Sequence, residues 1–130
     1  MSGPIRALIV DDEKIICEII EDILVFEGGG VEATSASSCD EALRLAGEHR
    51  FDVVFLDVCM GDGSGLDVLR EIKHVRPDAR IYMITGYQVE DQLRDALKQG
   101  AVGAIHKPFR VKEILSALRG DGSEGASLSD

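Results

Sequence analysis

The chain has 130 residues, of which 45% are apolar, and its 24 acidic and 14 basic side chains give a net charge of −10. This length and apolar content predict one folded domain rather than a disordered chain. The charge argues against direct binding to nucleic acid or to an anionic membrane, and no apolar run is long enough to span a bilayer.

The cysteines indicate a reducing environment. Cys17, Cys39 and Cys59 are odd in number and form no C-x-x-C motif, as is typical of a cytosolic protein with free thiols. The histidines have no ligand-like spacing relative to them, which argues against a zinc site. The N-terminus lacks a signal-peptide pattern, so we expect a cytoplasmic location.

Short apolar segments alternate with amphipathic segments along the whole chain. In chain order, the predicted elements are a strand at Arg6–Val10, a helix at Lys14–Glu27, a strand at Val31–Ser35, a helix from Ser38 to about His49, a strand at Val53–Asp57, a helix at Ser64–Val75, a strand at Ile81–Thr85, a helix at Val89–Gln99, a strand at Ala104–His106 and a helix at Arg110–Arg119. Gly28 ends the first helix, and a capping box from Ser38 to Glu41 opens the second.

Five strand–helix units predict an α/β fold in which helices cover both faces of a parallel sheet. Right-handed crossovers then make the sheet doubly wound. We expect this domain to span residues 1–119. Residues 120–130 are small and polar without periodicity, and they are expected to be a disordered tail or the start of a linker.

Five polar residues stand where the predicted strands end, and parallel strands bring such positions to one edge of the sheet. They are Asp11, Asp12, Asp57, Thr85 and Lys107. Adjacent carboxylates repel each other, and a divalent cation is the simplest compensation for that repulsion. Each residue alone has an ordinary structural explanation as a helix cap, a strand end or a solvated lysine, but their convergence favours a functional site.

The chemistry of these side chains suits phosphoryl transfer. Asp57 follows the middle strand and can act as a nucleophile toward phosphorus. Asp11 and Asp12 can hold a metal that neutralises phosphoryl oxygens, while Lys107 supplies a cation and Thr85 a hydroxyl donor.

Four motifs resemble the CheY-like receiver domain of two-component response regulators. They are Leu8-Ile9-Val10-Asp11-Asp12-Glu13, Val54-Phe55-Leu56-Asp57-Val58-Cys59-Met60, Ile84-Thr85-Gly86 and Lys107-Pro108-Phe109. The resemblance runs from about Arg6 to Arg119. It implies a flavodoxin-like (βα)₅ three-layer sandwich with five parallel strands in the order 2-1-3-4-5.

The resemblance also implies a phosphorelay function, in which Asp57 accepts phosphoryl from the phosphohistidine of a sensor histidine kinase or a phosphotransfer protein. Mg²⁺, for which Mn²⁺ can substitute, would be held by Asp11, Asp12, Asp57 and the backbone carbonyl of Cys59. Thr85 and Lys107 would bind the phosphoryl group, and the Lys107–Pro108 bond would be cis. Such a chain catalyses only its own phosphorylation and dephosphorylation, and an effector domain or protein reads its surface.

Three departures from the family pattern carry further expectations. Gly61 replaces a frequent proline, which predicts a looser loop after the third strand. Ala104 replaces the usual aromatic switch residue, so Thr85 movement and backbone shifts would have to carry the signal. Cys59 and the bulky Tyr87 flank the expected phosphoryl position, which predicts slow hydrolysis.

Other functions stay open on the residues alone. A Mg²⁺-dependent phosphohydrolase would usually carry a second Asp where Cys59 stands, and a nucleotide- or flavin-binding domain would usually carry a glycine fingerprint that is absent here. A scaffold without phosphorylation is a further alternative. A homodimer through the fourth helix, fifth strand and fifth helix is compatible with the mixed charge of that region.

Overall fold

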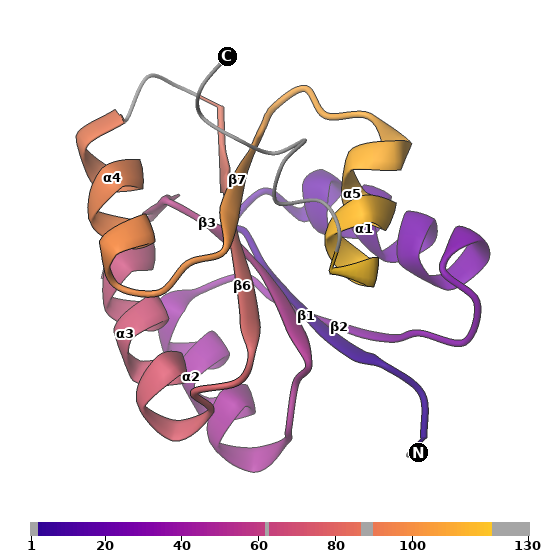
Figure 1. Cartoon of the computed structure of the whole chain (residues 1–130), viewed down its shortest axis with the longest axis horizontal. Helices are drawn as coiled ribbons and strands as arrows, with labels where there is room; N and C mark the ends of the chain where they lie inside the picture. Colours follow the sequence, from indigo (N-terminus) through magenta and orange to yellow (C-terminus); the bar gives the residue numbers. More distant parts are fainter. Residues whose placement is uncertain (1–2, 62, 87–89, 121–130) are drawn as a thin grey trace.

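A computed structural model describes residues 3–61, 63–86 and 90–120 and confirms the predicted fold class. The strands are β1 (Arg6–Val10), β2 (Glu32–Ala36), β3 (Val53–Asp57), β4 (Cys59–Met60), β5 (Gly63–Ser64), β6 (Arg80–Thr85) and β7 (Gly103–His106). The helices are α1 (Lys14–Glu27), α2 (Cys39–Glu48), α3 (Gly65–Val75), α4 (Glu90–Lys98) and α5 (Val111–Arg119). Figure 1 shows α1 and α5 on one face of the sheet and α2, α3 and α4 on the other.

The main sheet is parallel and has the strand order β2-β1-β3-β6-β7. This is the predicted order 2-1-3-4-5, because β4 and β5 belong to a separate two-stranded pair. β3 lies at the centre and all its residues are buried. Its continuous apolar sequence follows from this position, since a central strand covered on both faces has no solvent side.

Alternate side chains of the strands feed two cores. Val54 and Leu56 pack toward α2, α3 and α4, whereas Val53 and Phe55 pack toward α1 and α5. Phe55 stacks on Tyr82 of the neighbouring strand, with ring centroids 6.1 Å apart. Each large apolar side chain that becomes fully buried contributes about 1.5 to 3 kcal/mol, so the two cores fix β3 firmly between the helical layers.

Helix ends follow local sequence signals. The Ser38 hydroxyl accepts a hydrogen bond from the amide of Glu41 at 3.0 Å, so the second helix opens at the predicted cap. α5 ends at Gly120, whose φ of 84° is left-handed. The guanidinium of Arg80 donates to the carbonyl oxygens of Ala117 at 2.7 Å and Leu118 at 2.9 Å. A cation therefore satisfies the last carbonyls of α5.

Several details of the fold depart from expectation. β2 begins one residue later than predicted, at Glu32, whereas β6 and β7 each begin one residue earlier, at Arg80 and Gly103. After β3, where the sequence predicted a looser loop, Cys59 and Met60 pair antiparallel with Ser64 and Gly63 in a short hairpin. Tyr87 and the segment after Gly120 lie outside the described residues, so the expectations about them stay predictions.

Cys17 and Cys39 are buried and Cys59 is exposed, and all three are free thiols. Within the described part of the chain, every helix is too short or too polar to cross a membrane.

Candidate functional site

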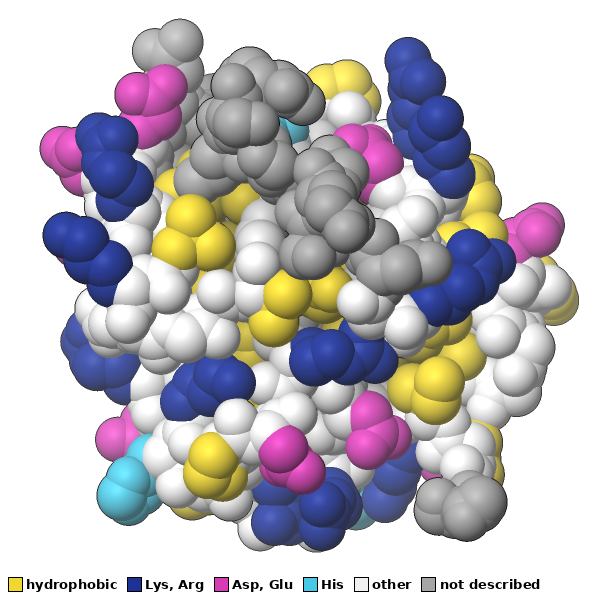
Figure 2. Space-filling view, in the orientation of Figure 1, with side chains coloured by type: hydrophobic (Ala, Val, Ile, Leu, Met, Phe, Trp, Pro, Cys, Tyr) yellow, Lys and Arg dark blue, Asp and Glu magenta, His cyan; other side chains and the backbone are white. Residues whose placement is uncertain are grey.

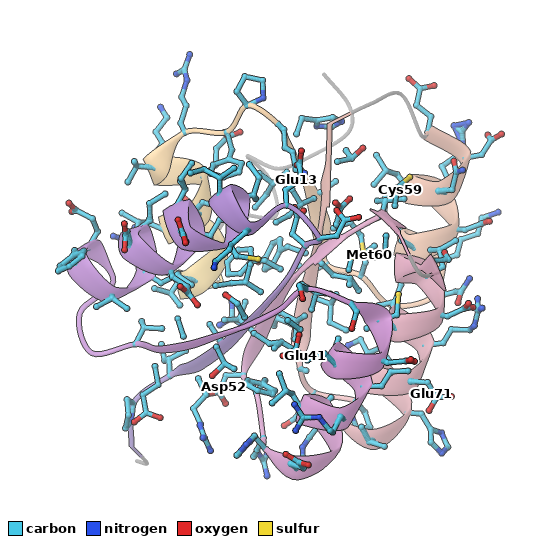
Figure 3. All side chains as sticks on the ribbon, turned by 180° about the vertical axis from the view of Figure 1, so that it is seen from behind. Glu13, Glu41, Asp52, Cys59, Met60 and Glu71 are labelled. Carbon is cyan, nitrogen blue, oxygen red and sulfur yellow. The ribbon has the colours of Figure 1, made fainter. Side chains whose placement is uncertain are left out.

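The parallel strands deliver the predicted site residues to one end of the sheet. Asp11 follows β1, Asp57 ends β3, Thr85 ends β6 and Lys107 follows β7. Figure 3 shows Glu13 and Cys59 at this end, whereas Asp52, which precedes β3, lies toward the opposite end. The topology thus unites residues that are up to 96 positions apart, from Asp11 to Lys107.

Three carboxylates meet at this edge. Asp11, Asp12 and Asp57 each place one oxygen within 4.8 Å of the others. Asp11 is fully buried and Asp57 is 7% exposed, while Asp12 is exposed. Such crowding of like charges costs free energy unless cations or hydrogen bonds compensate it.

Backbone amides orient the three carboxylates. Asp11 Oδ1 accepts a hydrogen bond from the amide of Glu13 at 2.8 Å, and Asp57 Oδ1 accepts one from the amide of Cys59 at 3.1 Å. The amide of Gly61 donates to Asp12 Oδ2 at 3.0 Å. A proline at this position would have no amide hydrogen to donate. Gly61 therefore allows the hydrogen bond to Asp12 that links the β4–β5 hairpin to the site.

Lys107 supplies the compensating cation. Its Nζ lies 2.9 Å from Asp11 Oδ2, 2.9 Å from Glu13 Oε1 and 3.5 Å from Asp57 Oδ2. Burial disfavours the charged ammonium, but the contacts with Glu13, Asp11 and Asp57 outweigh it, and the pKa of Lys107 is raised. The lysine therefore stays protonated throughout the physiological range.

The environment of Asp57 makes its charge costly. Burial raises the pKa of Asp57 from 3.8 to about 6; the hydrogen bond from Cys59 and the charge of Lys107 oppose the rise, and Asp11 adds to it. At pH 7 and above the group is still mostly ionised. A carboxylate that is both ionised and poorly solvated gains from any additional cation or electrophile placed beside it.

The acidic cluster fits a hard divalent cation. Asp11 Oδ2 is buried and accepts no hydrogen bond, so its only described compensation is the ion pair with Lys107. Asp12 and Asp57 present further carboxylate oxygens beside it, and carboxylate oxygens are the donors that Mg²⁺ and Ca²⁺ prefer. Which metal this site takes, and the part of the Cys59 carbonyl in holding it, stay predictions.

A cleft of about 290 Å³ opens beside Asp57. Its lining residues are Asp12, Glu13, Asp57, Cys59, Thr85, Gly86 and Lys107. Thr85 is 2% exposed, and its carbonyl oxygen accepts a hydrogen bond from the amide of Lys107 at 2.7 Å. That bond joins the ends of β6 and β7, and the Lys107–Pro108 peptide bond that follows is cis.

The sequence analysis gave two site residues no role. Glu13 was quoted only as part of the acidic motif, yet its carboxylate contacts Lys107. Gly65 begins α3, and a Cβ there would lie 2.1 Å from the carbonyl oxygen of Asp57. After the third strand, Gly61, Gly63 and Gly65 alternate with polar residues, and this glycine-rich run is the signal that could have pointed to Gly65. Glu13 offered only an acid next to the pair.

Comparisons with known proteins agree with this geometry. The chain matches the family described as response regulator receiver domain over residues 7–119. It is 35% identical over 113 residues to the chemotaxis protein CheY of Bacillus subtilis, covering 87% of this chain and 93% of that protein. It is 35% identical over 117 residues to the probable transcriptional regulatory protein TcrX of Mycobacterium tuberculosis, covering 89% of this chain but only 49% of TcrX.

A solved response regulator of Burkholderia pseudomallei, described with a phosphorylated aspartic acid, calcium ion and citrate, superposes with a TM-score of 0.82 at 33% identity. The match covers 93% of this chain and 70% of that one. Fold, motif order and family match agree, and this chain belongs to the response regulator receiver domain family.

Proposed function

We propose that this chain is a phosphorylation-driven switch of a two-component system, in which Asp57 accepts the phosphoryl group. The observation that carries the proposal is the position of Asp57 at the end of the central strand, 7% exposed, with its Oδ2 3.5 Å from the ammonium of Lys107. The phosphorylated aspartic acid named for the Burkholderia pseudomallei relative supports the same chemistry.

The donor would be the phosphohistidine of a sensor histidine kinase or a phosphotransfer protein. A carboxylate oxygen of Asp57 attacks phosphorus, a P–O bond forms, and the P–N bond breaks with its electron pair left on the imidazole nitrogen. Lys107 already stands beside that oxygen and would pair with the phosphoryl oxygens. Thr85 lines the same cleft and would donate its hydroxyl to one of them.

Asp11, Asp12, Asp57 and the carbonyl of Cys59 would hold the metal. Bound Mg²⁺, for which Mn²⁺ can substitute, would neutralise charge on the phosphoryl oxygens. The fit rests on the three gathered carboxylates and on the buried Asp11 oxygen without a hydrogen bond. The Burkholderia pseudomallei relative is described with a calcium ion, a divalent cation that, like Mg²⁺, prefers oxygen ligands.

A donor protein must cover the edge of the sheet to reach Asp57. α1 begins at this edge, and its Ile15 and Ile19 are 62% and 42% exposed. These two side chains are spaced four residues apart and therefore lie on the same side of the helix. They offer a kinase or phosphotransfer protein an apolar contact beside the cleft.

Output would pass to an effector domain or protein. The chain spans about half the length of several curated relatives that it matches, including TcrX and MprA. We propose residues 1–119 as the receiver domain and 120–130 as a tail or linker, with action in the cytoplasm. Figure 2 shows basic and acidic side chains interspersed on the face that carries α4, β7 and α5, and this mixed charge is compatible with a homodimer through that face.

The chain would catalyse only its own phosphorylation and dephosphorylation. Ala104 is 1% exposed beneath α4 and carries no ring to rotate, so Thr85 and backbone shifts would convey the state of Asp57. Cys59 lines the cleft where a phosphohydrolase would place a second acid, which favours a long-lived acyl phosphate over turnover.

The decisive experiment measures intact mass after incubation with acetyl phosphate and Mg²⁺. Wild type should gain one phosphoryl group of about 80 Da, and the gain should disappear with EDTA or in Asp57→Asn. A folded wild type that gains no mass in the presence of metal would refute the proposal and leave the scaffold function in front. Repeated turnover of acetyl phosphate without mass gain would favour the phosphohydrolase instead.

A further inference from the structure

Glu13 has a contact that the phosphorylation chemistry leaves unexplained. Its Oε1 lies 2.9 Å from Lys107 Nζ, as close as the buried Asp11 Oδ2. Figure 3 shows Glu13 at the edge of the sheet where Cys59 also lies. We propose that Glu13 holds Lys107 in the unphosphorylated protein and thereby lowers the affinity of the site for a phosphoryl group; the inference rests on the proposed function.

The ordinary explanation for an acid at this position is helix capping, and the structure argues against it. Glu13 is the N-cap residue of α1, but its side chain makes no capping hydrogen bond. Its backbone amide donates to Asp11 Oδ1 at 2.8 Å. The backbone amide and the side chain of Glu13 are therefore directed to the site, while its carbonyl oxygen accepts the first helical hydrogen bonds from the amides of Ile16 and Cys17.

A lysine ammonium has three N–H donors, and the three ion-pair partners that Lys107 has among the described residues are carboxylates. Nζ contacts Asp11 and Glu13 at 2.9 Å and lies 3.5 Å from Asp57. A phosphoryl group on Asp57 would bring three acceptor oxygens within reach of this ammonium. The N–H that faces Asp57 can pass to one of these oxygens, but a second bond to the phosphoryl group requires release of another resting contact. Glu13 is the natural one because its side chain is 59% exposed while that of Asp11 is fully buried.

The negative charge of a phosphoryl group would also favour release of Lys107 from Glu13. A phosphoryl group carries a charge of about −1.5 to −2 near pH 7, and it would bind the same ammonium that Glu13 contacts. The Glu13 carboxylate therefore both competes for Lys107 and repels the incoming group. Because the Glu13 side chain is largely solvated, the effect is moderate, and we expect a two- to five-fold change in affinity, as for other exposed ion pairs.

The experiment compares the affinity of wild type and Glu13→Gln for beryllofluoride, a non-covalent phosphoryl mimic, by calorimetry at saturating Mg²⁺. Glu13→Gln keeps the size of the side chain and removes its charge, so it should bind about two- to five-fold more tightly. Glu18→Gln is the matched control, since it removes an exposed acid from the same helix farther from the site. Its affinity should stay within about 1.5-fold of wild type, below the effect of an ion pair.

Three outcomes would overturn the inference. Equal or weaker binding by Glu13→Gln would show that Glu13 does not restrain the phosphoryl state. An equal gain in Glu18→Gln would assign the effect to the general charge of α1 rather than to the contact with Lys107. The third outcome concerns the contact between Glu13 and Lys107. A double-mutant cycle of Glu13→Gln and Lys107→Gln, followed by urea unfolding without metal, measures the coupling of these two side chains. Additive shifts in the unfolding midpoint would refute the contact.

The failure of the proposed function gives a different pattern. In that case wild type would take up neither beryllofluoride nor phosphoryl from acetyl phosphate, and Glu13→Gln would be equally inert. If wild type binds beryllofluoride normally and Glu13→Gln binds it no better, the function stands and the role of Glu13 falls.

Discussion

Asp57→Asn should make the metal-free protein more stable at neutral pH. Burial raises the pKa of the Asp57 carboxyl from 3.8 to about 6, so the folded state binds its proton more tightly than the unfolded state does. A difference of about two pKa units corresponds to about 3 kcal/mol of destabilisation once the group is ionised. Asparagine removes that charge and retains an oxygen that can accept the hydrogen bond from the Cys59 amide, now 3.1 Å long.

The sign of the pH dependence follows from the raised pKa. Below pH 3.8 the carboxyl is protonated in both states and costs nothing. The cost develops as pH rises from about 4 to 6 and is fully present above that window. Asn also removes an ion-pair partner of Lys107, which still contacts Asp11 and Glu13. We therefore expect Asp57→Asn to be more stable than wild type by about 1 to 3 kcal/mol at pH 7.5.

The assay is urea unfolding in EDTA at pH 7.5 and pH 4.5, followed by far-UV circular dichroism. The advantage of Asp57→Asn should shrink by more than half at pH 4.5. Asp78→Asn is the control, because that carboxylate is 73% exposed and its ion-pair partner among the described residues is the exposed Arg50, and its effect should stay within about 0.5 kcal/mol. An Asp57→Asn protein that is no more stable than wild type at pH 7.5, or whose advantage is independent of pH, would refute the reasoning.

Three further predictions follow from the same geometry. Lys107→Met leaves Asp11 and Asp57 without their cation, so it should lower the free energy of unfolding in EDTA by about 2 to 4 kcal/mol. The same variant should bind Mg²⁺ more tightly by calorimetry, because the ammonium competes with the metal, and weaker Mg²⁺ binding would contradict this. At pH 8 a thiol reagent should label only Cys59, because burial raises the pKa of Cys17 to about 11 and Cys39 is 8% exposed; rapid labelling of native Cys59→Ser would show otherwise. Gly65→Ala should lower the free energy of unfolding in urea by more than about 2 kcal/mol, because its Cβ would lie 2.1 Å from the Asp57 carbonyl oxygen. Gly47→Ala, with open space around its Cβ in α2, should raise that free energy by up to about 1 kcal/mol. Similar effects of the two substitutions would rule out the steric argument.

The sequence predicted the main sheet and the residues at its edge because each depended on a strong local signal. The apolar run Val53–Leu56 ends in the acid Asp57, and the structure places this strand at the centre of the sheet with every residue buried. Once five parallel strands were expected, the positions of Asp11, Thr85 and Lys107 followed from where their strands end. Topology thus brought distant residues together without any knowledge of side-chain contacts.

Features that depend on three-dimensional approach escaped prediction. The strands of the β4–β5 hairpin have two residues each, which is too short for any alternation of apolar and polar side chains. The contact of Glu13 with Lys107 joins residues 94 positions apart and depends on rotamers rather than on strand ends. The predicted start of β2 was one residue too early. Val31 is 7% exposed and packs in the core, so its apolar side chain resembles that of a strand residue although it precedes the strand.

The end of α5 limits how a signal could leave this domain. The left-handed conformation of Gly120 breaks the helical path, and Arg80 occupies the carbonyls of Ala117 and Leu118 that a longer helix would need for its own ladder. A twist or push along the axis of α5 would meet this break at Gly120. We expect torque transmission along α5 to be disfavoured, and we propose that a partner responds instead to the shape and charge of the surface of the domain.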